Sequence, residues 1–138
     1  MSGSVCFIIG LYHPPPSSQL LYTPTELLDY IRLILDDIAT ETGLAPTVIL
    51  TGDFNQLSDF DVLSLGLINV VNQPTHHGHN LDRLYTSEPL HYTCKVVKST
   101  VPTAHKAVIA VANANFVPDI TKKSIKDCAS RKRSPGAS

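Results

Sequence analysis

Two short apolar runs, separated by an amphipathic segment, dominate the first half of the chain. Residues 5–11 form one run, which stops just before Tyr12 and three consecutive prolines, and residues 47–51 form the other. Runs of this length that contain β-branched residues predict buried strands. Between them, apolar residues recur every three or four positions and predict one amphipathic helix: Leu27, Leu28, Ile31, Leu35 and Ile38.

The ends of this helix carry recognisable signals. Thr23 can act as the N-cap, Pro24 suits the first helical position, and Glu26 can close a capping box with Thr23. Gly43 is a suitable residue for the end of the helix. We expect one face of the helix to pack on a sheet.

The second half of the chain reads mostly as strands. Residues 56–71 predict a short helix and loop with a strand-like end at 68–71, and residues 72–80 form a polar loop. Further strands are predicted at 81–86, 91–97 and 106–111. The order predicts an α/β (α+β) fold in which a mixed sheet has a helix on one face, and the other face needs a cover.

The charge of the chain is divided unevenly. Residues 1–118 hold ten acidic and five basic groups, whereas residues 119–138 hold two acidic and six basic groups. We therefore expect one domain over 1–118 and a disordered basic tail over 119–138. An acidic body does not grip DNA by charge alone. The tail could contact phosphates or direct nuclear import, or it could be a solvated end: Lys122, Lys123, Lys126, Arg131, Lys132 and Arg133.

The cysteines and the hydropathy favour an intracellular protein. Cys6, Cys94 and Cys128 show no CxxC spacing, which suits reduced thiols better than a disulfide framework. No apolar run reaches the roughly 18–20 residues of a membrane span, and the chain does not begin with the basic segment of a signal peptide. We expect a soluble, intracellular protein without a membrane partner, which the tail could direct to the nucleus.

Four polar motifs stand near the predicted strands, at 12–15, 52–55, 79–82 and 103–106. Taken singly, each has an ordinary explanation. Asp53-Phe54-Asn55 is typical of a turn made by short polar side chains, and a lone His105 is typical of a hydrogen-bonded surface residue. The histidines within 76–79 could form a zinc site, although a flexible loop does not define the ligand geometry.

Taken in order, the motifs resemble the endonuclease/exonuclease/phosphatase superfamily, which includes DNase I and the AP endonucleases. The likeness is above all to endonuclease domains of non-LTR retrotransposons, with Tyr-x-Pro-Pro, Gly-Asp-Phe-Asn, Gly-His-(Thr/Asn)-Leu-Asp and Ser-Asp-His-Lys-Ala-Val in sequence. The matching stretches are 11–15 (LYHPP), 52–55 (GDFN), 74–86 (PTHHGHNLDRLYT) and 103–109 (TAHKAVI). The resemblance covers residues 5–112.

This resemblance implies a role for each matching residue. Asp53 would orient or activate the attacking water, and Asn55 would contact the scissile phosphate. His105 would stabilise the developing charge or act as an acid, and Asp82 would orient His105. Tyr12 would hydrogen-bond the phosphate. Mg²⁺ would neutralise the transition state, because phosphodiester hydrolysis uses a hard cation on oxygen ligands.

The chain departs from the family pattern in two ways. The family's Ser-Asp-His reads Thr103-Ala104-His105 here, and Ala104 cannot bind a cation or accept a proton. The family's N-terminal half, with an Asn and a metal-binding Glu, has no counterpart before residue 5. We therefore assign no metal ligand. The chain would be the C-terminal half of a four-layer α/β/β/α sandwich, and a homodimer could cover its exposed sheet face.

Three functions follow as alternatives. The chain could be an endonuclease-like fragment derived from a non-LTR retrotransposon, without phosphodiesterase activity as a monomer. It could instead be a Mg²⁺-dependent DNA endonuclease that is active as a dimer or with a partner. The third alternative is a nucleic-acid-binding or interaction module that uses the basic tail.

Overall fold

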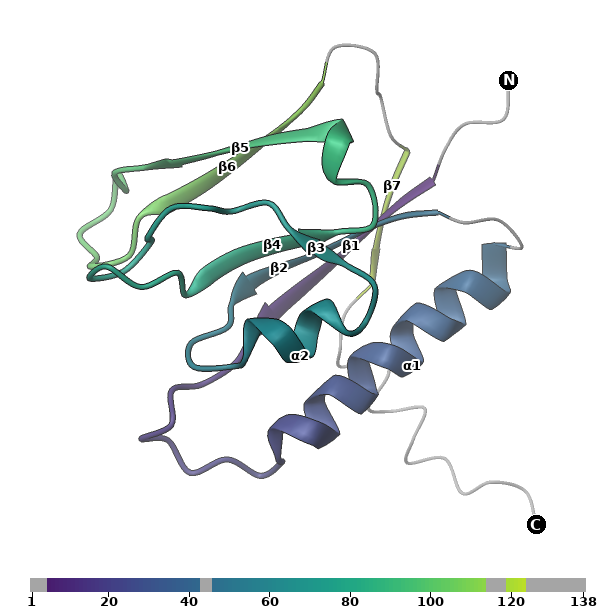
Figure 1. The fold of residues 1–138 in the computed structure, drawn as a ribbon, viewed down its shortest axis with the longest axis horizontal. Coiled ribbons are helices and arrows are strands. Elements are labelled where there is room, and N and C mark those ends of the chain that lie inside the picture. The colour runs from purple at the N-terminus through teal and green to yellow at the C-terminus, as the bar shows by residue number, and fades with distance from the viewer. Residues whose placement is uncertain (1–4, 43–45, 114–118, 124–138) are drawn as a thin grey trace.

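The computed structural model describes residues 5–42, 46–113 and 119–123. These residues form a five-stranded mixed sheet in the order β3-β4-β2-β1-β7 and a separate hairpin of β5 and β6. The elements are β1 (Val5–Tyr12), α1 (Pro24–Thr42), β2 (Thr47–Asp53), α2 (Asp59–Leu63), β3 (Ile68–Asn69), β4 (Asp82–Thr86), a 3₁₀ turn (Pro89–His91), β5 (Tyr92–Val97), β6 (Ala107–Ala112) and β7 (Asp119–Lys123). The predicted α/β fold with a mixed sheet is confirmed (Figure 1).

Helix α1 begins with the capping box that the sequence predicts. The Thr23 backbone N–H donates to Glu26 Oε2 at 2.8 Å, and the Glu26 N–H donates to Thr23 Oγ1 at 3.2 Å. These two bonds satisfy backbone donors that a helix start leaves without partners. The buried stripe also includes Ile34, which lies between the predicted positions. Gly43 lies outside the described residues.

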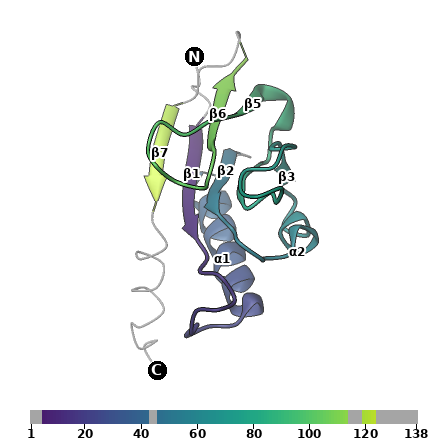
Figure 2. The same cartoon turned by 90° about the vertical axis from the view of Figure 1, so that its left-hand side faces the viewer.

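The five-stranded sheet separates two cores, because successive side chains of a strand point to opposite faces. One face, here the helix face, packs against α1 and α2. The opposite face, here the hairpin face, packs against β5 and β6 (Figure 1, Figure 2). The helix face carries Phe7, Ile9, Leu11, Val48, Leu50 and Tyr85, and the hairpin face carries Cys6, Ile8, Ile49 and Leu84.

The expectation that the second sheet face would lie exposed is wrong. Cys6, Ile49 and Leu84 on that face are buried, and half-buried residues of the hairpin pack over them. The inward positions of β5 alternate with outward ones, so the chain itself supplies the cover that the strand pattern alone did not reveal. Some apolar side chains are also exposed on the outer side of the hairpin: Val97, Ile109 and Val111.

The expectation of disorder from residue 119 onward does not hold for residues 119–123. These residues form β7, which pairs in parallel with β1 and extends the sheet on that side. Such pairing satisfies backbone groups whatever the side-chain charge, so a basic composition did not predict it. The basic residues from Lys126 to Arg133, and Cys128, lie outside the described residues.

Two further predictions concern membranes and thiols. Among the residues that the structure describes, no helix is both long and apolar enough to span a membrane. Cys6 and Cys94 are free thiols in the hairpin-face core, and burial raises the pKa of both.

Candidate catalytic site

The motif residues meet at one end of the five-stranded sheet. Strands β1 and β2 are parallel, so both end at the same edge, with Tyr12 beside Asp53. Strand β4 is antiparallel to β2 and begins at this edge, with Asp82 opposite Asp53. The segment before β6 brings His105 to the same place. Strand direction thus brings together Tyr12, Asp53 and Asp82, and the segment before β6 adds His105.

Strand alternation also places these residues on one face. Tyr12, Asp53 and Asp82 are even-numbered steps from Cys6, Ile49 and Leu84, which line the hairpin-face core. The site thus continues the hairpin face beyond its apolar part. Because His105 precedes β6, the hairpin is the element that carries it to the sheet.

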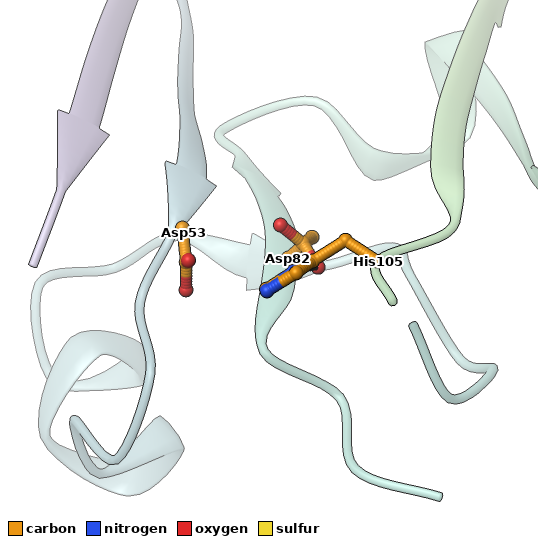
Figure 3. A group of neighbouring side chains, drawn as sticks. All are labelled: Asp53, Asp82 and His105. Carbon is orange, nitrogen blue, oxygen red and sulfur yellow. Dashed lines mark hydrogen bonds and ion pairs between the residues drawn. The ribbon is translucent and has the colours of Figure 1, made fainter. Parts of the chain in front are cut away.

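Asp53, Asp82 and His105 form the centre of the site (Figure 3). One potential ligand atom from each lies within 4.8 Å of the other two. His105 Nδ1 lies 2.8 Å from Asp82 Oδ2, a hydrogen-bonding distance. When Asp82 is ionised, it accepts a hydrogen bond from the Nδ1–H of a neutral His105 imidazole. The other ring nitrogen, Nε2, then carries no proton and can accept one. The pair is partly exposed, so solvent and a substrate can reach it.

The backbone around Asp53 depends on its neighbouring glycine. Gly52 has a φ of +146°, and a Cβ placed on it would lie 1.8 Å from the carbonyl oxygen of Leu11. No side chain fits there while β1 and β2 stay paired. After the strand, Asp53 Oδ1 accepts a hydrogen bond from the Asn55 N–H at 3.0 Å, which fixes the carboxylate's direction.

Asn55 ties two loops together. Its backbone is left-handed, with a φ of 44°, a conformation that asparagine tolerates better than most residues. Its side-chain Nδ2 donates to the carbonyl oxygen of His13, and the His13 N–H donates to the Asp53 carbonyl at 2.8 Å. The side chain is buried, with 9% exposed. This geometry shows a structural tie, whereas the predicted contact of Asn55 with phosphate stays a prediction.

Tyr12 and His13, at the end of β1, differ in their exposure to solvent. Tyr12 is 66% exposed beside Asp53, as a substrate-facing side chain would be. His13 is buried, with Nδ1 3.3 Å from the hydroxyl of Tyr22. Burial lowers the pKa of His13, and the nearby Asp53 opposes this shift.

Thr75 anchors the loop between β3 and β4. Its fully buried hydroxyl oxygen accepts the N–H groups of Leu81 at 3.1 Å and Asp82 at 2.9 Å. Its carbonyl oxygen accepts the Lys106 N–H at 2.7 Å. One side chain and one carbonyl thus connect the segments that carry Asp82 and His105. The hydroxyl of Thr103 also accepts the His105 N–H, at 3.2 Å.

His76 lies directly against His105. The centroids of the two imidazole rings are 4.4 Å apart, and their planes are inclined by 36°. The ring of His77 packs edge-on against His76, with the two ring centroids 4.3 Å apart. Desolvation is the largest cause that lowers the pKa of His76, and the nearby His105 and His77 lower it further. The charges of Asp82 and Asp53 oppose the shift. The neutral form of His76 is therefore favoured beside His105.

Arg83 supports the site from the helix face. Its buried guanidinium donates to the carbonyl oxygens of Leu57, Asn80 and Asn55, and to the Tyr85 hydroxyl. The Tyr85 hydroxyl in turn donates to Asp59 Oδ1 at 2.6 Å, and burial raises the pKa of Tyr85. These bonds tie the loop after β2 to the start of β4.

Of the three groups at the centre of the site, the two carboxylates suit a hard cation and the imidazole does not. Asp53 and Asp82 are directly opposed across an antiparallel pair, where like charges destabilise each other and a cation relieves the repulsion. Their carboxylates suit Mg²⁺, whereas the imidazole of His105 suits proton transfer better. Ala104 is exposed and supplies no ligand. The three described groups leave a cation such as Mg²⁺ in need of further oxygen ligands.

Thr75, His76 and Arg83 were not assigned from the sequence. Arg83 carried a weak signal, since it is a charged residue directly before Leu84 and Tyr85 inside a predicted strand. Thr75 and His76 belong to a polar loop whose composition does not reveal which side chain faces inward.

No protein-family model matches the chain, no curated protein is significantly similar to it, and no solved structure matches it. The resemblance to DNase I-like endonucleases therefore stays a prediction from its motifs.

Proposed function

We propose that this chain is an endonuclease-like module that carries the proton-transfer part of a phosphodiesterase site and does not hydrolyse phosphodiesters as a monomer. The observation that supports it most is the convergence of Asp53, Asp82 and His105, from three separate segments, within 4.8 Å. The family resemblance supplies the substrate class, DNA.

Each residue has a chemical task in this proposal. Asp82 accepts a hydrogen bond from Nδ1–H of His105. This leaves Nε2 available to take up a proton or, once protonated, to donate to a phosphate oxygen. Asp53, whose direction is set by the Asn55 N–H, accepts a hydrogen bond from the attacking water. The exposed hydroxyl of Tyr12 donates to the phosphate from the adjacent strand end. Bound Mg²⁺, held by the two carboxylates, would offset the negative charge on the phosphate.

An assembled form completes the site in this proposal. Mg²⁺ prefers about six oxygen ligands and keeps some as water, and the described residues offer two carboxylates. The outer side of the hairpin exposes Val97, Ile109 and Val111, which form an apolar surface suited to association. A two-fold homodimer is the simplest such assembly.

The test is plasmid nicking with Mg²⁺ on fractions whose oligomeric state is measured by sedimentation. We expect no nicking by the monomer, and nicking by the dimer that EDTA, Asp53→Asn and His105→Ala each abolish. Asp36→Asn, an exposed carboxylate on α1, is the matched control and should leave the activity unchanged.

Three outcomes would contradict parts of the proposal. Nicking by the monomer that depends on Asp53 would mean that the chain holds a complete site. Nicking that survives both site variants would remove Asp53 and His105 from the chemistry. A stable dimer without nicking would contradict the catalytic role of the assembly.

A further inference from the structure

We propose that His76 is a positioning residue that holds the imidazole of His105 in one orientation by stacking on its face. The inference rests on the proposed function, because it assigns His76 to the same site. It goes beyond the motif roles, none of which gives His76 a task.

His105 is restrained on two sides by different chemistry. The hydrogen bond from Nδ1 to Asp82 Oδ2, at 2.8 Å, restrains one ring edge but permits rotation about that bond. The ring of His76, 4.4 Å away and inclined by 36°, covers one ring face and limits this rotation. Together the two contacts direct Nε2, the atom that meets a substrate.

The loop does not need the His76 imidazole in order to fold. The backbone of His76 exchanges hydrogen bonds with His79, at 3.0 Å and 2.8 Å, across a tight turn. The turn contains left-handed His77 and Gly78, and buried Thr75 anchors the loop segment that precedes it. Because these are backbone and threonine contacts, a substitution of the half-buried His76 ring tests the stack rather than the loop.

The backbone also holds His76 next to His105. A β-bridge joins the backbones of the two residues, and the Lys106 N–H donates to the Thr75 carbonyl at 2.7 Å. The bridge sets the two side chains next to each other, as in a cross-strand pair. An aromatic pair in that register stabilises one rotamer of each partner beyond simple burial.

The test measures the orientation of His105 by NMR in the full chain at a pH about 1.5 units above the ordinary imidazole value of ~6.5. Side-chain couplings give the His105 rotamer populations, and long-range ¹H–¹⁵N spectra give its tautomer. The variants are His76→Gln, which removes the ring but keeps a polar side chain, and His76→Phe, which keeps the ring. His79→Gln, on the exposed part of the loop, is the control.

We expect His76→Gln to lower the ratio of the main His105 rotamer to the others by roughly 2- to 12-fold, the range that an aromatic pair supports. The Nδ1–H tautomer should decline with it, and His76→Phe should restore both. An unchanged His105 spectrum in His76→Gln, with backbone amides of β4 and β6 unshifted, would overturn the proposal. So would a loss that His76→Phe fails to restore.

The nicking assay reports on the proposed function separately. If Asp53→Asn leaves nicking unchanged but His76→Gln still releases His105, the positioning role stands while the proposed chemistry fails. If nicking depends on Asp53 and His105 while His76→Gln leaves the His105 rotamer unchanged, only the positioning role fails.

Discussion

The helix face and the hairpin face of the sheet bury apolar side chains to different depths. On the helix face, Ile9 and Leu50 of the sheet and Ile31 of α1 are all fully buried. On the hairpin face, Cys6, Ile49 and Leu84 of the sheet are buried, but Ile8 and the covering residues Val96 and Val108 are only partly buried. The polar site lies only at the end of the second face.

The two faces of the sheet therefore differ in their contribution: the helix face gives most of the stability, and the hairpin face carries the polar candidate residues. The helix face excludes water, so its side chains contribute the larger hydrophobic stabilisation. The hairpin face stays partly solvated and places two opposed carboxylates next to a histidine. The proposed site would have to admit water and substrate, and the partly solvated hairpin face permits this better than the densely covered helix face does.

The largest expected effect comes from truncating the helix-face core. Leu50→Ala should lower the free energy of unfolding by about 3 kcal/mol, because it leaves a cavity in a fully buried position. Val96→Ala in the hairpin should cost about 1 kcal/mol, because Val96 is only partly buried. Urea denaturation of both variants measures the difference. Equal losses would mean that the two faces contribute alike.

A second prediction concerns acid. Burial lowers the pKa of His13, so the folded state favours the neutral ring. The stabilisation is complete above about pH 6.5 and declines as the pH falls toward the folded pKa, with a slope of at most about 1.4 kcal/mol per pH unit from one group. Urea denaturation between pH 8 and pH 5 should show a shallower decline for His13→Gln than for the wild type. The exposed His79→Gln is the control, and an equal change in both variants would exclude His13 as the cause.

The smallest expected effect has the opposite sign. Asp53→Asn should raise the free energy of unfolding by about 0.5 kcal/mol, because it removes the repulsion between opposed carboxylates while an amide oxygen can still accept the Asn55 N–H. Thermal unfolding without Mg²⁺ measures this, with Asp36→Asn as the control. A lower free energy of unfolding for Asp53→Asn than for the wild type would show that neighbouring groups already compensate the negative charge of Asp53.

Part of this architecture could be predicted from the sequence. The capping box of Thr23 and Glu26 and the stripe through Leu27 and Ile31 depend on residues close in sequence. So do the strands predicted at 5–11 and 47–51, which in the structure continue to Tyr12 and Asp53. Local periodicity and capping chemistry decide such elements before any long-range contact forms. The order of the polar motifs also predicted which residues would carry the site, although their roles stay predictions.

Only the tertiary structure decided how these elements meet. Three contacts join segments that are distant in sequence. The hairpin covers Cys6 and Ile49, β7 pairs with β1, and the ring of His76 packs on that of His105. Strand register and backbone hydrogen bonds select these contacts, and neither leaves a periodic signal along the chain. The sequence by itself therefore determined the long helix, the strands before residue 113 and the candidate residues. The strand β7, the cover of the second sheet face and the orientation of the histidine depend on contacts that exist only in the folded protein.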